Sequence, residues 1–227
     1  MSTYTDLGIE LMVTGENAGT WGTKTNNNLN LIEQLTSGFA TLDIAGGAGT
    51  QALDIDDGAL TGTAQQRIIE FTGSITGNRI ITIPNDVETF YILKNSTSGA
   101  YTVQFKYLTG SGSSTTFSAT DKGIKTVYAS ANDGTNPDIV DVMANSSEIV
   151  LANNNPIKFN DADNSAFVGI DAPATVSGSY TLTLPAAVGS ASQALVTTDG
   201  SGTLGFTSTS TFGITTGKAI AMAIVFG

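Results

Sequence analysis

Apolar and polar positions follow two different periodicities along the chain. Between residues 25 and 38 the apolar side chains recur at helical spacing, and at about 100° per residue they fall within roughly half of a helix circumference. The apolar residues of this segment are Leu29, Leu31, Ile32 and Leu35. Thr25 is placed to cap the start of this helix, and Gly38 suits the C′ position at its end. The pattern predicts one short amphipathic helix, after which alternation with period two takes over.

Residues 40–144 contain short runs in which apolar and polar residues alternate. In the clearest run, Tyr101, Val103, Phe105 and Tyr107 share one face and polar residues share the other, as in a half-solvated strand. Several such runs separated by turn residues predict an antiparallel β-sandwich. The predicted strands are Thr50–Asp54, Arg67–Phe71, Arg79–Ile83, Thr89–Lys94, Tyr101–Tyr107, Lys122–Tyr128 and Asp138–Met143.

Two pairs of adjacent isoleucines, Ile68-Ile69 and Ile80-Ile81, place apolar groups on both faces of their strands. This pattern predicts central or subunit-contacting strands. No internal repeat of the kind that signals a parallel β-helix is evident. Gly46–Gly49 is rich in glycine but lacks the lysine and the strand-to-helix context of a nucleotide site, and it is interpreted as a hinge.

Residues 156–206 have a different composition, dominated by Gly, Ser, Thr, Ala and Asn with brief apolar strands such as Tyr180–Leu184. Such a segment buries too little apolar surface to offset an ordering cost of roughly 1–2 kcal/mol per residue. It is therefore either disordered or ordered by neighbouring chains, and its period-two pattern with Pro and Gly punctuation favours neighbouring chains.

The last residues alternate small and large apolar side chains, the large ones being Ile220, Met222, Ile224 and Phe226. A strand of this kind is stable only when it is covered. It is either an edge strand buried in the chain's own sandwich or, the favoured interpretation, an interface among identical subunits.

Composition and charge exclude several classes of protein. Hydrophobic residues make up 40% of the chain, charged residues only 13%, and the formal net charge is −11. With no basic stripe, binding to nucleic acid is not expected. The absence of Cys and His removes a disulfide framework, a thiolate nucleophile, the usual general base and the commonest zinc ligands. No leader and no run of about 20 apolar residues is present, so the expectation is a soluble protein without membrane insertion, assembled in a cytoplasm.

Acidic residues offer two weak candidates for chemistry. Asp161–Asn164 opens like a calcium loop, but Ala166 and Ala172 stand where Gly and a bidentate Glu are required, which favours a polar turn. The cluster of Asp54, Asp56 and Asp57 is interpreted as a solvated loop rather than a hard-cation site. Glycan cleavage needs two carboxylates at a fixed separation, and no pair stands in a context that predicts a raised pKa. The chain is therefore not expected to be an enzyme or to bind a cofactor or metal.

Several motifs resemble those of tail-fibre-like virion proteins of tailed bacteriophages, marine ones especially. They are Gly15 to Glu33, the succession from Phe71-Thr72-Gly73 through Lys94–Val103 to Asp133–Asn136, Phe159–Asn164, Ala172–Val176, Leu182–Pro185, Thr197–Leu204 and the Gly217–Met222 ending. The resemblance covers most of the chain. It implies an elongated homotrimer in the virion, with residues 1–39 as an attachment segment, 40–144 as the β-sandwich domain and 145–227 as an extended, intertwined distal part.

The resemblance also implies that the N-terminal end faces the particle. The only tryptophan, Trp21, lies in a glycine-rich loop just ahead of the predicted helix, and with Leu29, Ile32 and Leu35 it is a candidate for virion attachment. The alternative is that Trp21 is an ordinary core residue of the chain's own β-domain.

The function implied is a short tail fibre, or an adaptor that joins other fibre components to the particle. Expected partners are identical subunits and tail, collar or capsid proteins, with a glycan or protein of the host surface as a further candidate. The closest alternative is a capsid decoration protein, and a glycan-degrading tailspike is a third.

Overall fold

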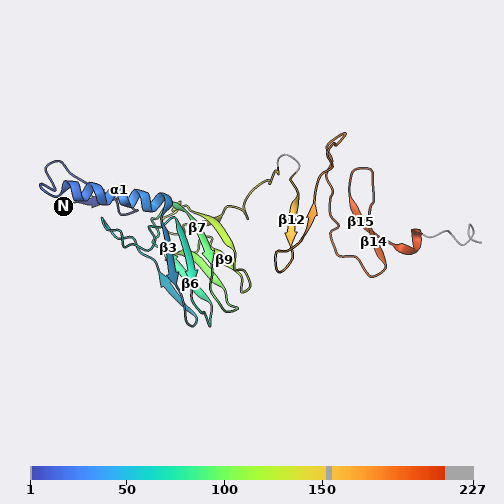
Figure 1. Cartoon of the computed structure of the whole chain (residues 1–227), viewed down its shortest axis with the longest axis horizontal. Coiled ribbons are helices and arrows are strands. Elements are labelled where there is room, and N and C mark those ends of the chain that lie inside the picture. Colours follow the sequence, from blue (N-terminus) through green and yellow to red (C-terminus); the bar gives the residue numbers. More distant parts are fainter. Residues whose placement is uncertain (1, 152–154, 213–227) are drawn as a thin grey trace, which may run out of the picture. The chain divides into compact units, whose positions relative to one another are not determined.

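The computed structural model describes residues 2–151 and 155–212 (Figure 1). The chain divides into two compact units, Met1–Ile149 (unit 1) and Val150–Gly227 (unit 2), and each unit is described by itself. The described residues form a mainly β structure with one α-helix and several antiparallel and mixed sheets. The mainly β prediction is therefore confirmed.

The helix α1 spans Trp21–Ser37, and it begins four residues before the predicted cap at Thr25. The residue at the N-cap is Thr20, whose hydroxyl donates to the Asn17 carbonyl at 3.2 Å and makes no cap hydrogen bond. The backbone amide of Trp21 also donates to Asn17, at 2.9 Å. The prediction of Thr25 as a cap was wrong because the preceding turn, and not a side chain, opens the helix.

The helix ends at Gly38, as predicted, but for another reason than a left-handed backbone. Gly38 has φ −62° and ψ 144°, which any residue can adopt, and its amide donates to the Gln34 carbonyl at 2.8 Å. A Cβ at this position would stand 2.3 Å from the side-chain oxygen of Gln66 and 2.4 Å from the Gln34 carbonyl. Glycine is needed here for close approach.

Two larger sheets build the β part of unit 1. One has the strand order β11-β10-β7-β5-β3 and the other β4-β6-β8-β9. The strands are β3 (Phe39–Asp43), β4 (Gly49–Ala52), β5 (Ile68–Thr72), β6 (Arg79–Ile83), β7 (Thr89–Asn95), β8 (Val103–Tyr107), β9 (Thr115–Phe117), β10 (Ile124–Ala129) and β11 (Ile139–Asp141). A short hairpin of β1 (Thr3–Tyr4) and β2 (Glu10–Leu11) precedes α1.

The chain alternates between the two sheets from β3 to β8, so that β3–β4, β5–β6 and β7–β8 form three successive coils. All strand pairs between successive coils are parallel. The expectation of antiparallel pairing was wrong for these strands, and the coils are a stacked repeat that the sequence pattern did not reveal. Only β9, β10 and β11 add antiparallel pairs, to the β7 and β8 side of the stack.

The stacking register explains why the repeat was hidden. Between the second and third coils every pair is offset by 24 residues, from Ile68 beside Ile92 to Ile83 beside Tyr107. Between the first and second coils the offset is 29 in one sheet, as for Phe39 beside Ile68, and 30 in the other, as for Gly49 beside Arg79. A repeat whose length changes between copies leaves no fixed period in the sequence.

The turn at Gly46–Gly49 is a corner of the first coil and not a hinge. The Gly46 amide donates to Ser74 at 3.0 Å, and the Gly46 carbonyl accepts from Thr76 at 2.8 Å. Gly46 has φ 112°, a backbone conformation that favours glycine. The corner is thus hydrogen-bonded to the corner of the second coil.

The core of unit 1 lies between the two sheets. Phe71 of β5 meets Phe117 of β9 edge to face at 6.5 Å between ring centroids, and Tyr91 of β7 meets Phe105 of β8 at 5.4 Å. All four rings are fully buried. The strands with adjacent isoleucines, β5 and β6, are central in their sheets, as predicted.

Unit 2 contains two separate hairpins, β12 (Ile157–Asn160) with β13 (Phe167–Ile170) and β14 (Gln193–Thr197) with β15 (Leu204–Ser208), followed by a 3₁₀ turn at Thr209–Phe212. Among residues 150–151 and 155–210, no side chain is buried within the chain. Two-stranded hairpins are at best marginally stable in water, so this unit lacks a core of its own within the described residues.

Candidate interaction surfaces

One of the asparagines of α1, a residue type that weakens intrinsic helix propensity, holds the N-terminal hairpin against the helix. The side-chain amide of Asn28 donates to the Glu10 carbonyl at 2.9 Å, and its side-chain oxygen accepts the Glu10 backbone amide at 3.0 Å. One side chain thereby replaces a strand partner for β2. The pattern of apolar and polar residues along the helix did not reveal this role.

Glu10 anchors the same contact through its carboxylate, which is only 2% exposed. Lys24 forms an ion pair with it at 2.9 Å, and the Asn17 amide donates to it at 3.3 Å. Hydrogen bonds from Ser2 and Lys24 lower the pKa of Glu10 below its ordinary value. A buried carboxylate with this many donors holds its charge, so the hairpin and the helix form one structural element.

The same side of α1 also holds the loop after β4. Asn27 donates to the Gly58 carbonyl at 3.4 Å, and Gln34 donates to the Leu60 carbonyl at 3.3 Å. Leu31 lies on this side and is fully buried. One side of the helix is therefore packed against its own chain by polar side chains around a single leucine.

The residues predicted for attachment lie elsewhere on the helix. The exposed fractions are 65% for Trp21, 58% for Leu29 and 45% for Ile32, whereas Leu35 is half-buried. The interpretation of Trp21 as a core residue of its own chain is wrong. The structure brings Leu29 and Ile32 together on an exposed surface and separates them from Leu31, with which the sequence pattern had grouped them.

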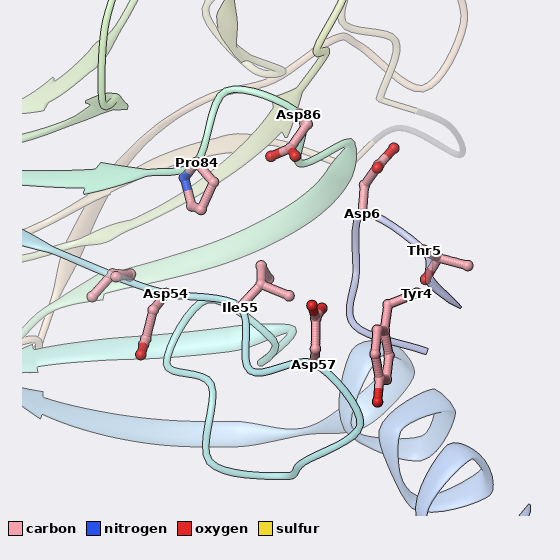
Figure 2. Close-up of a pocket in the computed structure, with 9 residues that line it drawn as sticks. Tyr4, Thr5, Asp6, Asp54, Ile55, Asp57, Pro84 and Asp86 are labelled. Atoms are coloured by element: carbon pink, nitrogen blue, oxygen red, sulfur yellow. The ribbon is translucent and has the colours of Figure 1, made fainter. Parts of the chain in front are cut away.

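A cavity of about 460 Å³ opens beside the N-terminal hairpin, and carboxylates line it (Figure 2). Three segments contribute: Tyr4–Asp6 of the N-terminal hairpin, residues 53–57 after β4, and residues 84–86 after β6. Its acidic members are Asp6, Asp54, Asp57 and Asp86. Asp6 and Asp86 were not singled out from the sequence, because the loops that bring them to Asp54 and Asp57 are far apart along the chain.

The acidic residues after β4 close their own loop. The Asp54 carboxylate accepts the Thr63 hydroxyl at 2.6 Å and the Thr63 amide at 3.2 Å, and these bonds lower the pKa of Asp54. The Asp56 carboxylate accepts the Thr61 hydroxyl. Over the described part of the chain, no group of three or more acidic residues has an arrangement that could hold a metal ion. Asp54 and Asp57 are exposed, which agrees with the prediction of a solvated loop.

The turn at Asp161–Asn164 is also closed by its own hydrogen bonds. Asp161 accepts the Ser165 hydroxyl at 3.2 Å, Asp163 accepts the Ser165 amide at 3.0 Å, and Asn164 has φ 60°. The segment connects β12 to β13. It is the polar turn that the sequence favoured over a calcium loop.

The hairpin of β12 and β13, which this turn connects, exposes one apolar face. Because residues directly opposite in an antiparallel pair share a face, Ile157 lies beside Ile170 and Phe159 beside Val168 on the same side. Their exposed fractions run from 50% to 73%. In the second hairpin Leu195 is paired with Phe206, and both are exposed. Unit 2 thus presents apolar strand faces that its described residues do not cover.

The predicted interface residues Ile220, Met222, Ile224 and Phe226 lie outside the described residues. Across residues 2–151 and 155–212, no helix has the length and apolar character needed to cross a membrane. Comparisons with protein-family models, with curated proteins and with solved structures find no match.

Proposed function

We propose that this protein is a structural component of a tailed-phage virion, a short tail fibre or an adaptor that joins other fibre components to the particle. The observation that carries the proposal is unit 2, whose described apolar strand faces are exposed in the single chain. A segment that leaves so many apolar residues exposed needs contacts with neighbouring chains to become ordered. The sequence resemblance supplies the class of assembly in which such chains occur.

The proposed architecture is an elongated homotrimer with a β-sandwich domain. Two sheets that enclose one core, with ring contacts such as Phe71 to Phe117, support the sandwich. The uncovered hairpin faces support association of identical subunits, since rotational symmetry brings the same faces together. The mass of the purified protein from light scattering tests this directly: a trimer is expected, and a monodisperse monomer in dilute buffer would contradict it.

The attachment segment in this proposal is residues 1–39, with Trp21, Leu29, Ile32 and Leu35 as contact residues. Exposed large side chains on a helix that is packed on its other side support this assignment. Partners would be tail, collar or capsid proteins, and the distal part would contact the host surface or another fibre component. The protein would be assembled in the host cytoplasm and located in the virion, without a cofactor or an enzymatic activity.

Two other functions are separable by experiment. A capsid decoration protein would share a symmetric, non-enzymatic attachment to the particle, and antibody labelling of intact particles distinguishes it because decoration covers the head whereas fibres lie at the tail or collar. A glycan-degrading tailspike is favoured only by the stack of parallel coils. Release of reducing sugar ends from host surface polysaccharide would support the tailspike and overturn the proposal.

A further inference from the structure

Helix α1 has three sides that differ in what they contact. The packed side holds the N-terminal hairpin and the loop after β4 through Asn28, Asn27 and Gln34. A second side carries the exposed polar residues Asn30 and Glu33. The third side, here named the apolar stripe, consists of Trp21, Thr25, Leu29, Ile32 and Thr36.

The spacing of the apolar stripe is that of a helix–helix contact. Its members follow one another at intervals of four, four, three and four residues, and at about 100° per residue they span an arc of roughly 80°. Intervals of three and four place side chains in a continuous seam along a partner helix. Thr36 at the end of the stripe donates its hydroxyl to the carbonyls of its own helix, at 2.9 Å to Ile32 and 2.9 Å to Glu33. Covering Thr36 therefore leaves no unpaired donor.

The charge distribution favours identical copies as the partner. Lys24 and Glu33 are the charged residues of the helix, and Lys24 is paired with Glu10 at 2.9 Å on the packed side. The apolar stripe itself carries no charge in a chain of net charge −11. Copies of an acidic chain can approach one another along the stripe without charge repulsion between the facing residues.

The low intrinsic stability of α1 also indicates that the helix needs a further packing partner. Four of the seventeen residues of α1 are asparagines, no acidic residue stands in its first turn and no basic residue in its last. A helix with low propensity and uncompensated ends depends on packing. Its own chain supplies packing on one side only, around Leu31.

We propose that the apolar stripe packs against the same stripe of neighbouring copies, so that the α1 helices form a parallel bundle around the axis of the oligomer. The inference rests on the proposed homotrimer and names the surface and partner that hold its N-terminal end. It moves Leu29 and Ile32 from the particle contacts proposed above to contacts between subunits. Trp21, at the N-terminal end of the stripe, and the exposed Leu11 and Val13 then remain for the particle.

Cysteine substitution tests the contact, because the natural chain contains no cysteine. Leu29→Cys and Ile32→Cys each place one thiol in the stripe, and Asn30→Cys places one on the exposed polar side of the same helix. The purified full-length variants are treated with a short bifunctional maleimide and separated on a denaturing gel. The stripe variants are expected to yield mostly cross-linked chains, and Asn30→Cys only traces.

The outcomes separate this inference from the function on which it rests. Equal cross-linking at all three positions, or none in the stripe of a protein with the mass of a trimer, overturns the helix bundle and leaves the homotrimer standing. A monomeric wild-type protein overturns both. Cross-linking of the stripe to a different protein in assembled particles, with none between copies, also overturns the bundle and assigns the stripe to the particle.

A charge variant gives an independent readout. Ile32→Glu would bring like charges together at the axis of the bundle, whereas Asn30→Glu adds the same charge on the polar side. Hydrogen exchange of residues 21–37 is expected to become faster in Ile32→Glu and to stay unchanged in Asn30→Glu. Unchanged exchange in both variants contradicts the bundle, because a buried glutamate could not be tolerated there.

Discussion

Units 1 and 2 use the same kind of strand, and only unit 1 covers its apolar faces within the described chain. Phe105 of β8 alternates with polar neighbours and is fully buried, whereas Phe159 of β12 alternates with polar neighbours and is 58% exposed. The difference lies in the number of strands around each residue. β8 is part of a four-stranded sheet that packs on a five-stranded sheet, and β12 has one partner. Alternation therefore predicts a strand, but the stacking of strands decides whether its apolar face is buried.

The energetic consequence of this difference is large. Full burial of a Phe, Leu or Ile side chain stabilises a fold by about 1.5–3 kcal/mol, and unit 1 gains this contribution many times over from its core. The described hairpins of unit 2 gain almost none of it from their own chain. The proposed association of subunits would supply the burial that unit 2 lacks, which makes the comparison testable.

The largest expected effect is Phe71→Ala in the core of unit 1. Removal of a fully buried ring that contacts Phe117 is expected to lower the free energy of unfolding by about 3–5 kcal/mol. Urea unfolding followed by circular dichroism measures it. The matched variant Phe159→Ala in unit 2 should leave the unfolding of unit 1 unchanged within about 0.5 kcal/mol. Equal losses in both variants would show that the two units share one core.

Deletion of the last eleven residues sharpens the comparison further. If unit 2 is ordered by neighbouring chains through this apolar end, residues 156–206 should become sensitive to protease while residues 40–144 remain resistant. Limited proteolysis with mass spectrometry of the fragments measures both regions in one sample. Unchanged resistance of 156–206 in the truncated protein would show that each chain orders unit 2 alone.

Buried tyrosines give unit 1 a response to alkali. The Tyr91 hydroxyl donates to the Ala64 carbonyl at 2.7 Å, so Tyr91→Phe should cost about 1–3 kcal/mol by leaving that carbonyl unsatisfied. Burial raises the pKa of Tyr91, and it raises the pKa of Tyr107 to about 12. Both folded-state pKa values lie above the unfolded value of about 10. The stability that the two neutral tyrosines contribute is therefore fully present below about pH 10 and is lost as pH rises further.

Chemical denaturation at neutral and alkaline pH checks this prediction. The control is Tyr180→Phe in unit 2, whose side chain is 63% exposed and which should unfold as the wild type does. A Tyr91→Phe protein with unchanged stability at neutral pH would contradict the assigned hydrogen bond.

A smaller, local effect is expected from Glu10→Gln. Loss of the ion pair with Lys24 should loosen the N-terminal hairpin without unfolding the coils. Since the pKa of Glu10 is lowered, its contribution is present above the unfolded value of about 4.3 and is lost as pH falls through the folded value. Hydrogen exchange of residues 2–14 should become faster in Glu10→Gln, and in the wild type at acid pH. Glu33→Gln on the exposed side of α1 is the control.

The smallest effect on stability is expected from Trp21→Ala. Its side chain is 65% exposed, so the change in unfolding free energy should stay within about 0.5 kcal/mol, while incorporation into virions should fall. Melting temperature and incorporation are measured on the same preparations. A large drop in melting temperature, or normal incorporation at unchanged stability, would contradict a role for Trp21 in attachment.

Features that depend only on residues close together in the sequence were predicted well. The strand β6 has the predicted bounds, and the polar turn at Asp161 was recognised from two missing ligands. The short strands β3 and β9 were missed. Strand β3 has few large apolar residues, and β9 is three residues long, so neither produces a clear pattern of alternation. The helix was found, but its start was misplaced because a turn at Asn17 opens it.

Candidate surfaces were harder to predict for a physical reason. Leu29, Leu31 and Ile32 fall on one half of the helix by spacing alone, but only Leu31 is buried. What separates them is the direction from which the hairpin at Glu10 and the loop near Gly58 approach. These contacts join residues 18 and 31 positions apart, so no local window contains them.

The amino-acid sequence by itself determined the β character of the chain, the change in composition near residue 145 and the polar nature of its acidic loops, because these follow from residue type and short periodicity. Only the tertiary structure decided that β3 to β8 pair in parallel as three stacked coils. Alternation with period two is the same in parallel and antiparallel strands, and the direction of pairing depends on partners 24 to 30 residues away. The tertiary structure also decided which apolar faces are buried, because a strand's apolar face is covered only when other strands or other chains pack against it.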